Sequence, residues 1–266
     1  MKTMLSVGAL ALMTIAGQAS AAVIYDSHGF EAPTFAAGTI EGQDGWFVDP
    51  ALHTQHQVVG PTLVGANMVN PAGGSQMVQI SQTTASRFSF PDITAGVAGR
   101  PVGDNWVINN FDIFAPSGQT SAGFFGVLAY NSSFNTLAGV RLRASDGLVV
   151  VTIDPDGAGS TFAFGNYSIG LNAPLGTWVN LGIAINVATN DVAILSGTSV
   201  LLAGTTQVAG ANATLSDFDL YSPGDATLTN SMFIDNYIVT TDTTAPAPGA
   251  AGLLGLAGLV ATRRRR

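Results

Sequence analysis

Three groups of side chains have types and spacings that could do chemistry: carboxylates, a histidine pair, and tryptophans near amides. Hydrolysis of a glycosidic bond needs two carboxyl groups that face each other across a cleft, about 5 to 10 Å apart. The two glutamates, Glu31 and Glu41, lie close together near the N-terminus in no such spacing. A pair drawn from the aspartates stays open, so glycoside hydrolysis is kept as a second alternative function.

Aspartate spacing raises the question of calcium. Asp154-Pro155-Asp156-Gly157 has the turn-borne form that often wraps Ca²⁺ with oxygen ligands, but no glutamate follows at the EF-hand distance. Because Asp, Pro and Gly also form plain turns, the turn is favoured and Asp154 and Asp156 are only a weak metal candidate. No cofactor is expected, with Ca²⁺ as the open alternative.

Two further acidic positions lie on expected strands. Alternation places Asp217 and Asp219 on one strand face, which we expect to be solvated. Asp235 shares an expected face with Phe233 and Tyr237, so we predict that it is partly buried and hydrogen bonded within the sheet edge rather than bound to a metal.

The histidines and serines give no catalytic pattern. His53 and His56 form the only histidine pair, and zinc would require two more ligands in a chain without cysteine. No Gly-x-Ser-x-Gly sequence is present, so a serine nucleophile is not supported.

Sugar binding would use an exposed aromatic ring beside hydrogen-bonding amides. Trp46 and Trp178 are candidates, and Asn180 follows Trp178 on the polar side of its expected strand. Trp106 is a third candidate ring. Burial in the core is the commoner position for so large a side chain, and both interpretations stay open.

The charge of the chain is concentrated outside its two ends. All 17 acidic residues lie between Asp26 and Asp242, whereas the same region holds four arginines and no lysine. The body therefore carries a net charge of −13, which repels nucleic acid and anionic lipid. No nucleic-acid partner is expected.

The elements that would position these residues are strands. In Trp178 to Val187, apolar Val179, Leu181, Ile183 and Ile185 alternate with smaller or polar residues, as in a half-buried strand. Further strands are expected at Thr62–Met68, Gln76–Ile80, Trp106–Phe114, Gly123–Tyr130, Leu137–Arg143, Leu148–Ile153, Thr161–Phe164, Val192–Leu195, Phe218–Tyr221 and Met232–Val239. No helical periodicity appears outside the two ends. The sequence therefore predicts an all-β antiparallel sandwich over residues 22–240.

Two segments point to one kind of sandwich. Phe30-Glu31 followed by Gly38 to Trp46, and the closing segment Phe233 to Val239, resemble the first and last strands of secreted concanavalin A-like lectin/glucanase domains. The resemblance implies a jelly roll whose N- and C-terminal strands pair side by side. Since this fold carries lectins, glycanases and inert spacers, it does not choose among them.

The N-terminus has the layout of a secretory signal. Lys2 gives a positive start, Met4 to Ala16 is apolar, and Ala19-Ser20-Ala21 is a small-residue cleavage site. We expect residues 1–21 to be removed by signal peptidase after delivery to the export machinery, so that the mature chain begins at Ala22.

The C-terminus combines a linker at 241–248 with an apolar segment and an arginine cluster at 249–266. About 13 uncharged residues from Gly249 to Ala261 would reach roughly 20 Å as a helix, short of a bilayer core of about 30 Å. We therefore expect transient membrane contact, with the arginines on the cytoplasmic side.

This tail resembles the sorting signal of PEP-CTERM proteins, which are substrates of exosortase-type enzymes. Pro246 and Pro248 match the two prolines of the motif, Ala247 replaces its usual glutamate, and the cluster is Arg263, Arg264, Arg265 and Arg266. The resemblance implies an exosortase-type partner and a place at the cell surface.

Taken together, these features predict an exported, non-enzymatic surface or matrix protein that contacts extracellular polysaccharide. The first alternative is a lectin-like carbohydrate-binding module assisted by Ca²⁺.

Overall fold

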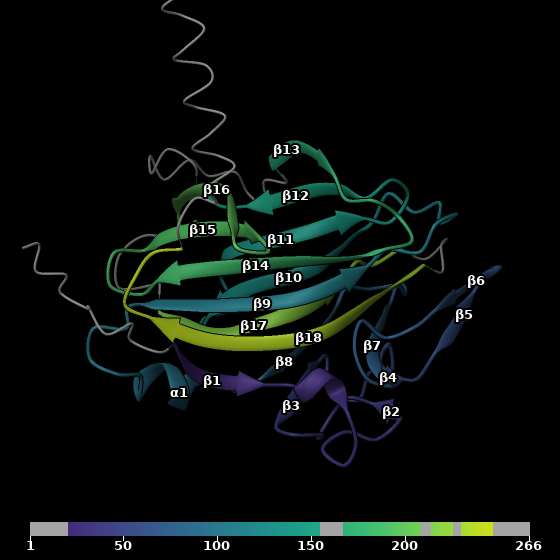
Figure 1. Ribbon diagram of the computed structural model, residues 1–266, viewed down its shortest axis with the longest axis horizontal. Helices are drawn as coiled ribbons and strands as arrows, with labels where there is room; N and C mark the ends of the chain where they lie inside the picture. The colour runs from purple at the N-terminus through teal and green to yellow at the C-terminus, as the bar shows by residue number, and fades with distance from the viewer. Residues whose placement is uncertain (1–20, 155–166, 209–213, 226–229, 247–266) are drawn as a thin grey trace, which may run out of the picture.

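The computed structural model describes residues 21–154, 167–208, 214–225 and 230–246. In this part of the chain two antiparallel sheets stack face to face (Figure 1). This arrangement confirms the predicted all-β antiparallel sandwich.

The larger sheet, sheet A, has nine strands in the order β16-β15-β14-β9-β18-β7-β4-β2, with β1 also paired to β18. Its strands are β1 (Ala22–Asp26), β2 (Gly38–Thr39), β4 (His56–Val59), β7 (Met77–Ser81), β9 (Trp106–Phe114), β14 (Trp178–Asn186), β15 (Asp191–Ser196), β16 (Ser199–Thr205) and β18 (Ser231–Asp242). The predicted pairing of the first and last strands is confirmed, since Ala22 lies opposite Thr241. The last strand runs two residues beyond the predicted boundary at 240.

The smaller sheet, sheet B, has seven strands in the order β13-β12-β11-β10-β17-β8-β3. They are β3 (Trp46–Asp49), β8 (Arg87–Pro91), β10 (Phe124–Asn131), β11 (Thr136–Arg143), β12 (Leu148–Thr152), β13 (Tyr167–Asn172) and β17 (Leu215–Ser222). The predicted strand at Thr161–Phe164 lies outside the described residues.

Three local elements differ from the expectation. The predicted strand Thr62–Met68 is a hairpin of β5 (Thr62–Val64) and β6 (Asn67–Val69), because Gly65 adopts a positive φ that reverses the chain. Two short helices, η1 (His28–Phe30) and α1 (Thr94–Ala98), also form in the body, where no helix was expected. They are too short to leave a periodic signal.

Membrane contact was assigned to the C-terminal segment 249–266, which lies outside the described residues. Among the residues that are described, no helix combines the length and the apolar character needed to cross a bilayer.

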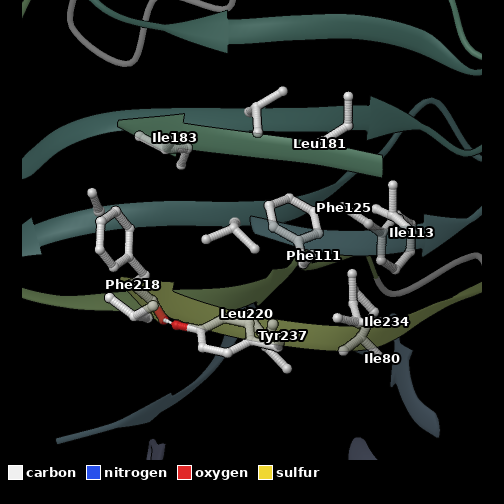
Figure 2. Packing of buried hydrophobic residues seen from close by; sticks show 14 of the residues in the cluster. Ile80, Phe111, Ile113, Phe125, Leu181, Ile183, Phe218, Leu220, Ile234 and Tyr237 are labelled. Atoms are coloured by element: carbon white, nitrogen blue, oxygen red, sulfur yellow. Dashed lines mark hydrogen bonds between the residues drawn. The ribbon is translucent and has the colours of Figure 1, made fainter. Parts of the chain in front are cut away.

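The core fills the space between the two sheets (Figure 2). Phe111 and Ile113 of β9 and Leu181 and Ile183 of β14 point inward from sheet A. The alternation in the sequence predicted this for the two residues of β14. Across from them lie Phe125, Phe218 and Leu220 of sheet B. The hydroxyl of Tyr237 donates a hydrogen bond of 2.7 Å to the carbonyl of Phe218, which joins the sheets inside the core.

A bulge in β18 corrects the expected placement of Asp235. The register with β9 shifts between Asp235 and Ile238, and Asn236 has a φ of 49°. Tyr237 therefore turns into the main core, whereas Phe233 packs in a separate cluster on the outer side of sheet A. Asp235 is fully buried and shares a face with Phe233 but not with Tyr237.

Each of the two segments that resemble lectin/glucanase ends contributes one carboxylate that binds the loop at residues 72–76. The Glu31 carboxylate accepts hydrogen bonds from the backbone N–H groups of Ser75 (2.5 Å) and Gln76 (2.7 Å). The Asp235 carboxylate accepts from the N–H groups of Ala72 (2.8 Å) and Gly73 (3.2 Å). Burial raises the pKa of Asp235 to about 6, and the hydrogen bonds from these N–H groups limit the rise because they stabilise the charged carboxylate. Asp235 is therefore hydrogen bonded, but it is fully buried and accepts from a loop, whereas partial burial and bonding within the sheet edge were predicted.

Candidate functional site

The face of sheet B that points away from the core carries a group of charged and aromatic side chains. On β17, Phe218 and Leu220 belong to the core, so alternation turns Asp217, Asp219 and Tyr221 to the opposite side. We call this side the outer face of sheet B. It also carries Tyr130 of β10, Arg141 of β11, and Phe88 and Phe90 of β8.

A pocket of about 470 Å³ opens at one end of this outer face. Its apolar wall consists of Phe47, Phe90 and Phe134. Its acidic groups are Asp49 of β3, Asp92 between β8 and α1, and Asp217 of β17. Among the described residues that line the pocket, none is basic. The volume lies within the roughly 300–1,000 Å³ of small-molecule sites.

Two aromatic rings of the wall stand open to solvent. Phe47 is 53% exposed and stacks on Phe90, with ring centroids 6.0 Å apart and planes inclined by 30°. Phe134 is 73% exposed, the more open of the two. Exposed rings grouped at one pocket offer an apolar contact surface to a ligand.

The turn between β10 and β11 fixes the position of Phe134. The Asn131 side-chain oxygen accepts hydrogen bonds from the N–H groups of Ser133 (3.0 Å) and Asn135 (2.9 Å). The N–H of Phe134 donates to the Asn131 carbonyl at 2.9 Å, and Phe134 adopts a φ of 58°. A bulky residue in the left-handed region is strained, and such strain concentrates at functional positions.

Asp217 and Asp219 form a buried carboxyl pair, of which Asp217 lines the pocket. They are 8% and 6% exposed, so the expectation of a solvated acidic face is wrong. Burial raises the pKa of both groups, and the charge of Asp217 raises that of Asp219 well above its usual range. The Oδ1 atom of each carboxyl group has no hydrogen-bond partner among the described residues. The pair therefore holds one proton more readily than two separate aspartates would.

Arg141 lies on the same outer face. Its guanidinium carbon sits 5.5 Å from the centre of the Tyr221 ring, and its Nη2 donates to the Thr152 hydroxyl at 2.9 Å. Tyr221 in turn packs against Phe88, with ring centroids 5.4 Å apart. This strip of aromatic and charged side chains continues the pocket along the sheet.

The predicted tryptophan platforms are not in the pocket. Trp46 is 1% exposed and its indole N–H donates to the Tyr25 hydroxyl at 2.6 Å, so the expectation that it forms an exposed platform is wrong. Alternation on β3 explains the difference, because Trp46 and Val48 face the core while Phe47 and Asp49 face outward. Trp106 is also buried, on the outer side of sheet A.

Trp178 and Asn180 lie on the other sheet, on the outer side of sheet A. The Trp178 ring is half-buried against Phe114, and its N–H donates to the Asn70 carbonyl at 2.9 Å. The Asn180 amide donates to the Asp112 carboxylate at 2.8 Å. Both side chains are thus satisfied within the protein and are not brought together with the pocket.

The predicted calcium pair falls on the boundary of the described chain. Asp154 is buried, and its backbone exchanges hydrogen bonds with Thr205 of β16 at 2.9 and 2.7 Å, which ties the end of β12 to sheet A. Asp156 lies outside the described residues. Within the part of the chain that the structure describes, no three His, Cys, Asp or Glu side chains gather as a metal site.

The histidine pair sits between the sheets. The rings of His53 and His56 are 4.8 Å apart and nearly perpendicular. His56 is fully buried, with its two ring nitrogens 2.7 Å from the Ser89 hydroxyl and 3.0 Å from the Ser222 hydroxyl. Burial lowers the pKa of His56 well below its usual range, so the ring is held neutral.

The residues of the two processing signals are mostly beyond the described ranges. Ala21 is exposed immediately before β1, and Pro246 lies four residues after β18. Ala19, Pro248 and the cluster Arg263 to Arg266 lie outside the described residues.

The sequence analysis did not identify the pocket, because it did not predict which strands pair with which. Two signals were nevertheless present: the alternation Trp46-Phe47-Val48-Asp49, and the repetition of Phe at positions 88 and 90. Each puts aromatic side chains on one strand face. What the sequence alone does not supply is that β3, β8 and β17 are neighbours.

No family model and no curated protein matches this chain. Among solved structures it is similar to a carbohydrate esterase of the Shiga toxin-encoding bacteriophage phi24B, with a TM-score of 0.48, 12% identity, and coverage of 71% of this chain and 91% of that one. It is similar to the cellulose induced protein Cip1, with a TM-score of 0.47, 11% identity, and coverage of 79% and 97%. It also resembles a sialidase (TM-score 0.46, 11% identity, 73% of this chain), of which it spans only 17%. At these identities and scores, the likenesses carry no argument about function.

Proposed function

We propose that this is an exported surface protein whose sandwich domain binds a polysaccharide in the pocket on the outer face of sheet B. The observation that carries the proposal is the pocket itself, in which the exposed rings of Phe47 and Phe134 stand beside the carboxyl groups of Asp49, Asp92 and Asp217. A sugar ring has an apolar face of C–H groups and a rim of hydroxyl groups. Aromatic rings receive the first and carboxylates accept hydrogen bonds from the second.

The proposal is tested by titrating oligosaccharides into the purified full chain by calorimetry. Phe134→Ala removes an exposed ring from the pocket and is expected to weaken binding about tenfold, a loss of about 1.4 kcal/mol. Leu63→Ala is the matched control, because Leu63 is similarly exposed (63%) but lies on the β5–β6 hairpin. Equal binding by both variants would contradict the assignment of the pocket.

Glycoside hydrolysis is a second candidate, favoured by the convergence of three carboxyl groups on one pocket. Asp217 and Asp219 lie two positions apart on the same face of β17, and of the two only Asp217 lines the pocket. A catalytic pair would therefore combine Asp217 with Asp49 or Asp92. Release of reducing ends by the wild type and its loss in Asp217→Asn would support hydrolysis, and binding without release supports a non-enzymatic protein.

The export route rests on the two terminal segments. A signal peptidase would release the chain before Ala22, and an exosortase-type enzyme would process the tail that begins near Pro246. Mass spectrometry of the protein recovered from the cell surface tests both steps. An intact Met1, or a chain that still ends at Arg266, would overturn the corresponding step.

A further inference from the structure

The pocket is negatively charged throughout. Asp49, Asp92 and Asp217 line it, Asp219 lies beside Asp217, and none of the described lining residues is basic. The region from Asp26 to Asp242 adds to this field, since it holds 17 acidic residues against four arginines. A polymer of uronic acids or sulfated sugars would bring like charge into this pocket, which disfavours it as a ligand.

Asp217 brings a largely buried carboxyl group to the wall of the pocket. The side chain is 8% exposed, it lines the pocket, and its Oδ1 atom has no hydrogen-bond partner among the described residues. A carboxyl group in this position, with Asp49 and Asp92 on the same pocket, suits a positively charged donor.

The aromatic wall favours the same kind of ligand. Phe47, Phe90 and Phe134 surround the pocket, and two of them are largely exposed. The faces of such rings attract a cation held within about 6 Å, most strongly when the cation also sheds water. A neutral sugar would gain only ring contacts and hydroxyl hydrogen bonds here, whereas an ammonium group gains from the rings and the carboxylates together.

We infer that the pocket recognises a glycan with free amino groups, such as a de-N-acetylated polymer of glucosamine. The inference rests on the proposed function and deepens it by naming the chemical class of the sugar. The protonated amine is placed against Asp217, and the ring of the same sugar unit packs on Phe134. An N-acetyl group in place of the amine abolishes the charge and leaves one N–H donor of the three.

The test is calorimetric titration of the full chain at about pH 6, below the usual pKa of an amino group. The probes are a glucosamine hexasaccharide, the N-acetylglucosamine hexasaccharide of the same length, a cellulose hexasaccharide, and an oligogalacturonate. Asp217→Asn keeps the size of the side chain but not its charge. Asp191→Asn is its matched control, because Asp191 is an exposed acid at the start of β15 on the other sheet.

The glucosamine hexasaccharide is expected to bind at least about tenfold more tightly than its N-acetylated counterpart, with affinity falling as salt is added. Asp217→Asn is expected to weaken it by about tenfold or more, whereas Asp191→Asn leaves it unchanged. The comparison between probes uses the wild type alone, so it stands even if Asp217→Asn fails to fold.

Other outcomes separate this inference from the proposed function. Equal or tighter binding of the N-acetylated, cellulose or galacturonate probe overturns the inference and leaves glycan binding in place. Binding of none of the four overturns both. Equal affinity for spermidine or short polylysine, lost in the same Asp217→Asn variant, would show an ammonium site without sugar specificity and so also overturns the inference.

Discussion

Replacing Phe134 separates the strain of the β10–β11 turn from the recognition chemistry of the pocket. The φ of 58° places Phe134 in the left-handed region, which costs a residue with a Cβ atom roughly 1–2 kcal/mol. Glycine adopts this conformation without that cost but loses roughly 0.5–1 kcal/mol more conformational entropy on folding. Phe134→Gly is therefore expected to be more stable than Phe134→Ala by about 0.5–1 kcal/mol.

The lost ring affects both variants equally. Phe134 is 73% exposed, so about a quarter of a ring surface of roughly 150–250 Å² is buried, worth about 1 kcal/mol. Phe134→Ala should thus lose about 1 kcal/mol, and Phe134→Gly should lie close to the wild type. Urea unfolding of the three proteins measures these differences, provided that their m-values agree.

Binding provides the second half of this test. Both variants should lose glycan affinity to the same extent, because both lack the ring. A glycine variant that is no more stable than the alanine variant would refute the strain at Phe134. An alanine variant whose free energy of unfolding falls by several kcal/mol would show that the ring serves the stability of the fold and not the binding of a ligand.

Three other predictions concern buried polar groups. Tyr237→Phe should lower the free energy of unfolding by about 1–3 kcal/mol, because the Phe218 carbonyl loses its buried donor; an unchanged urea midpoint would contradict this. Asp219→Asn should be more stable than the wild type by about 1–2 kcal/mol at neutral pH, since an amide can donate to Asp217 without a buried charge. Burial raises the pKa of Asp219 in the fold, so the wild type should recover stability as pH falls through that pKa, and the gap between the two urea curves should shrink; a constant gap would count against the coupled pair. His56 should remain neutral at about pH 6.5, the usual midpoint of a histidine, because burial lowers the pKa of His56. Its contribution to stability is then full above that pH and declines as pH falls below it, and ring-proton NMR that showed a midpoint near the usual value would disprove the effect.

Strands with regular alternation were predictable from the sequence. Trp178 to Asn186 and Leu148 to Thr152 form strands within a residue of their expected limits, because their side chains face either core or solvent with period two. The bulge at Asn236 was not predictable in the same way. It inserts a residue without any Gly or Pro signal, and it reverses the faces of every residue that follows in β18.

The pocket was less predictable than the fold, because its residues come from four separate segments. Asp217 was recognised as part of a strand face, but its burial depends on neighbours such as Phe90 and Asn131, which the sequence does not pair with it. Trp46 was chosen for its large ring, whereas the adjacent Phe47 reaches the pocket. Residue type pointed to the correct strand, and only the pairing of strands decides which of two neighbouring rings is outside.

The position of β18 sets the order in which this protein can mature. Residues 231–242 are the last strand of the body, yet they lie between β9 on one side and β7 and β1 on the other. The sandwich therefore cannot close until nearly the whole chain has been delivered, and contacts between such distant segments form slowly. On the export route proposed above, the body would emerge as an unfolded chain, and β18 would pair with β1 only after that. The sorting tail, four residues beyond that strand, would by then be all that remains in the membrane, so that completion of the fold and readiness for processing coincide.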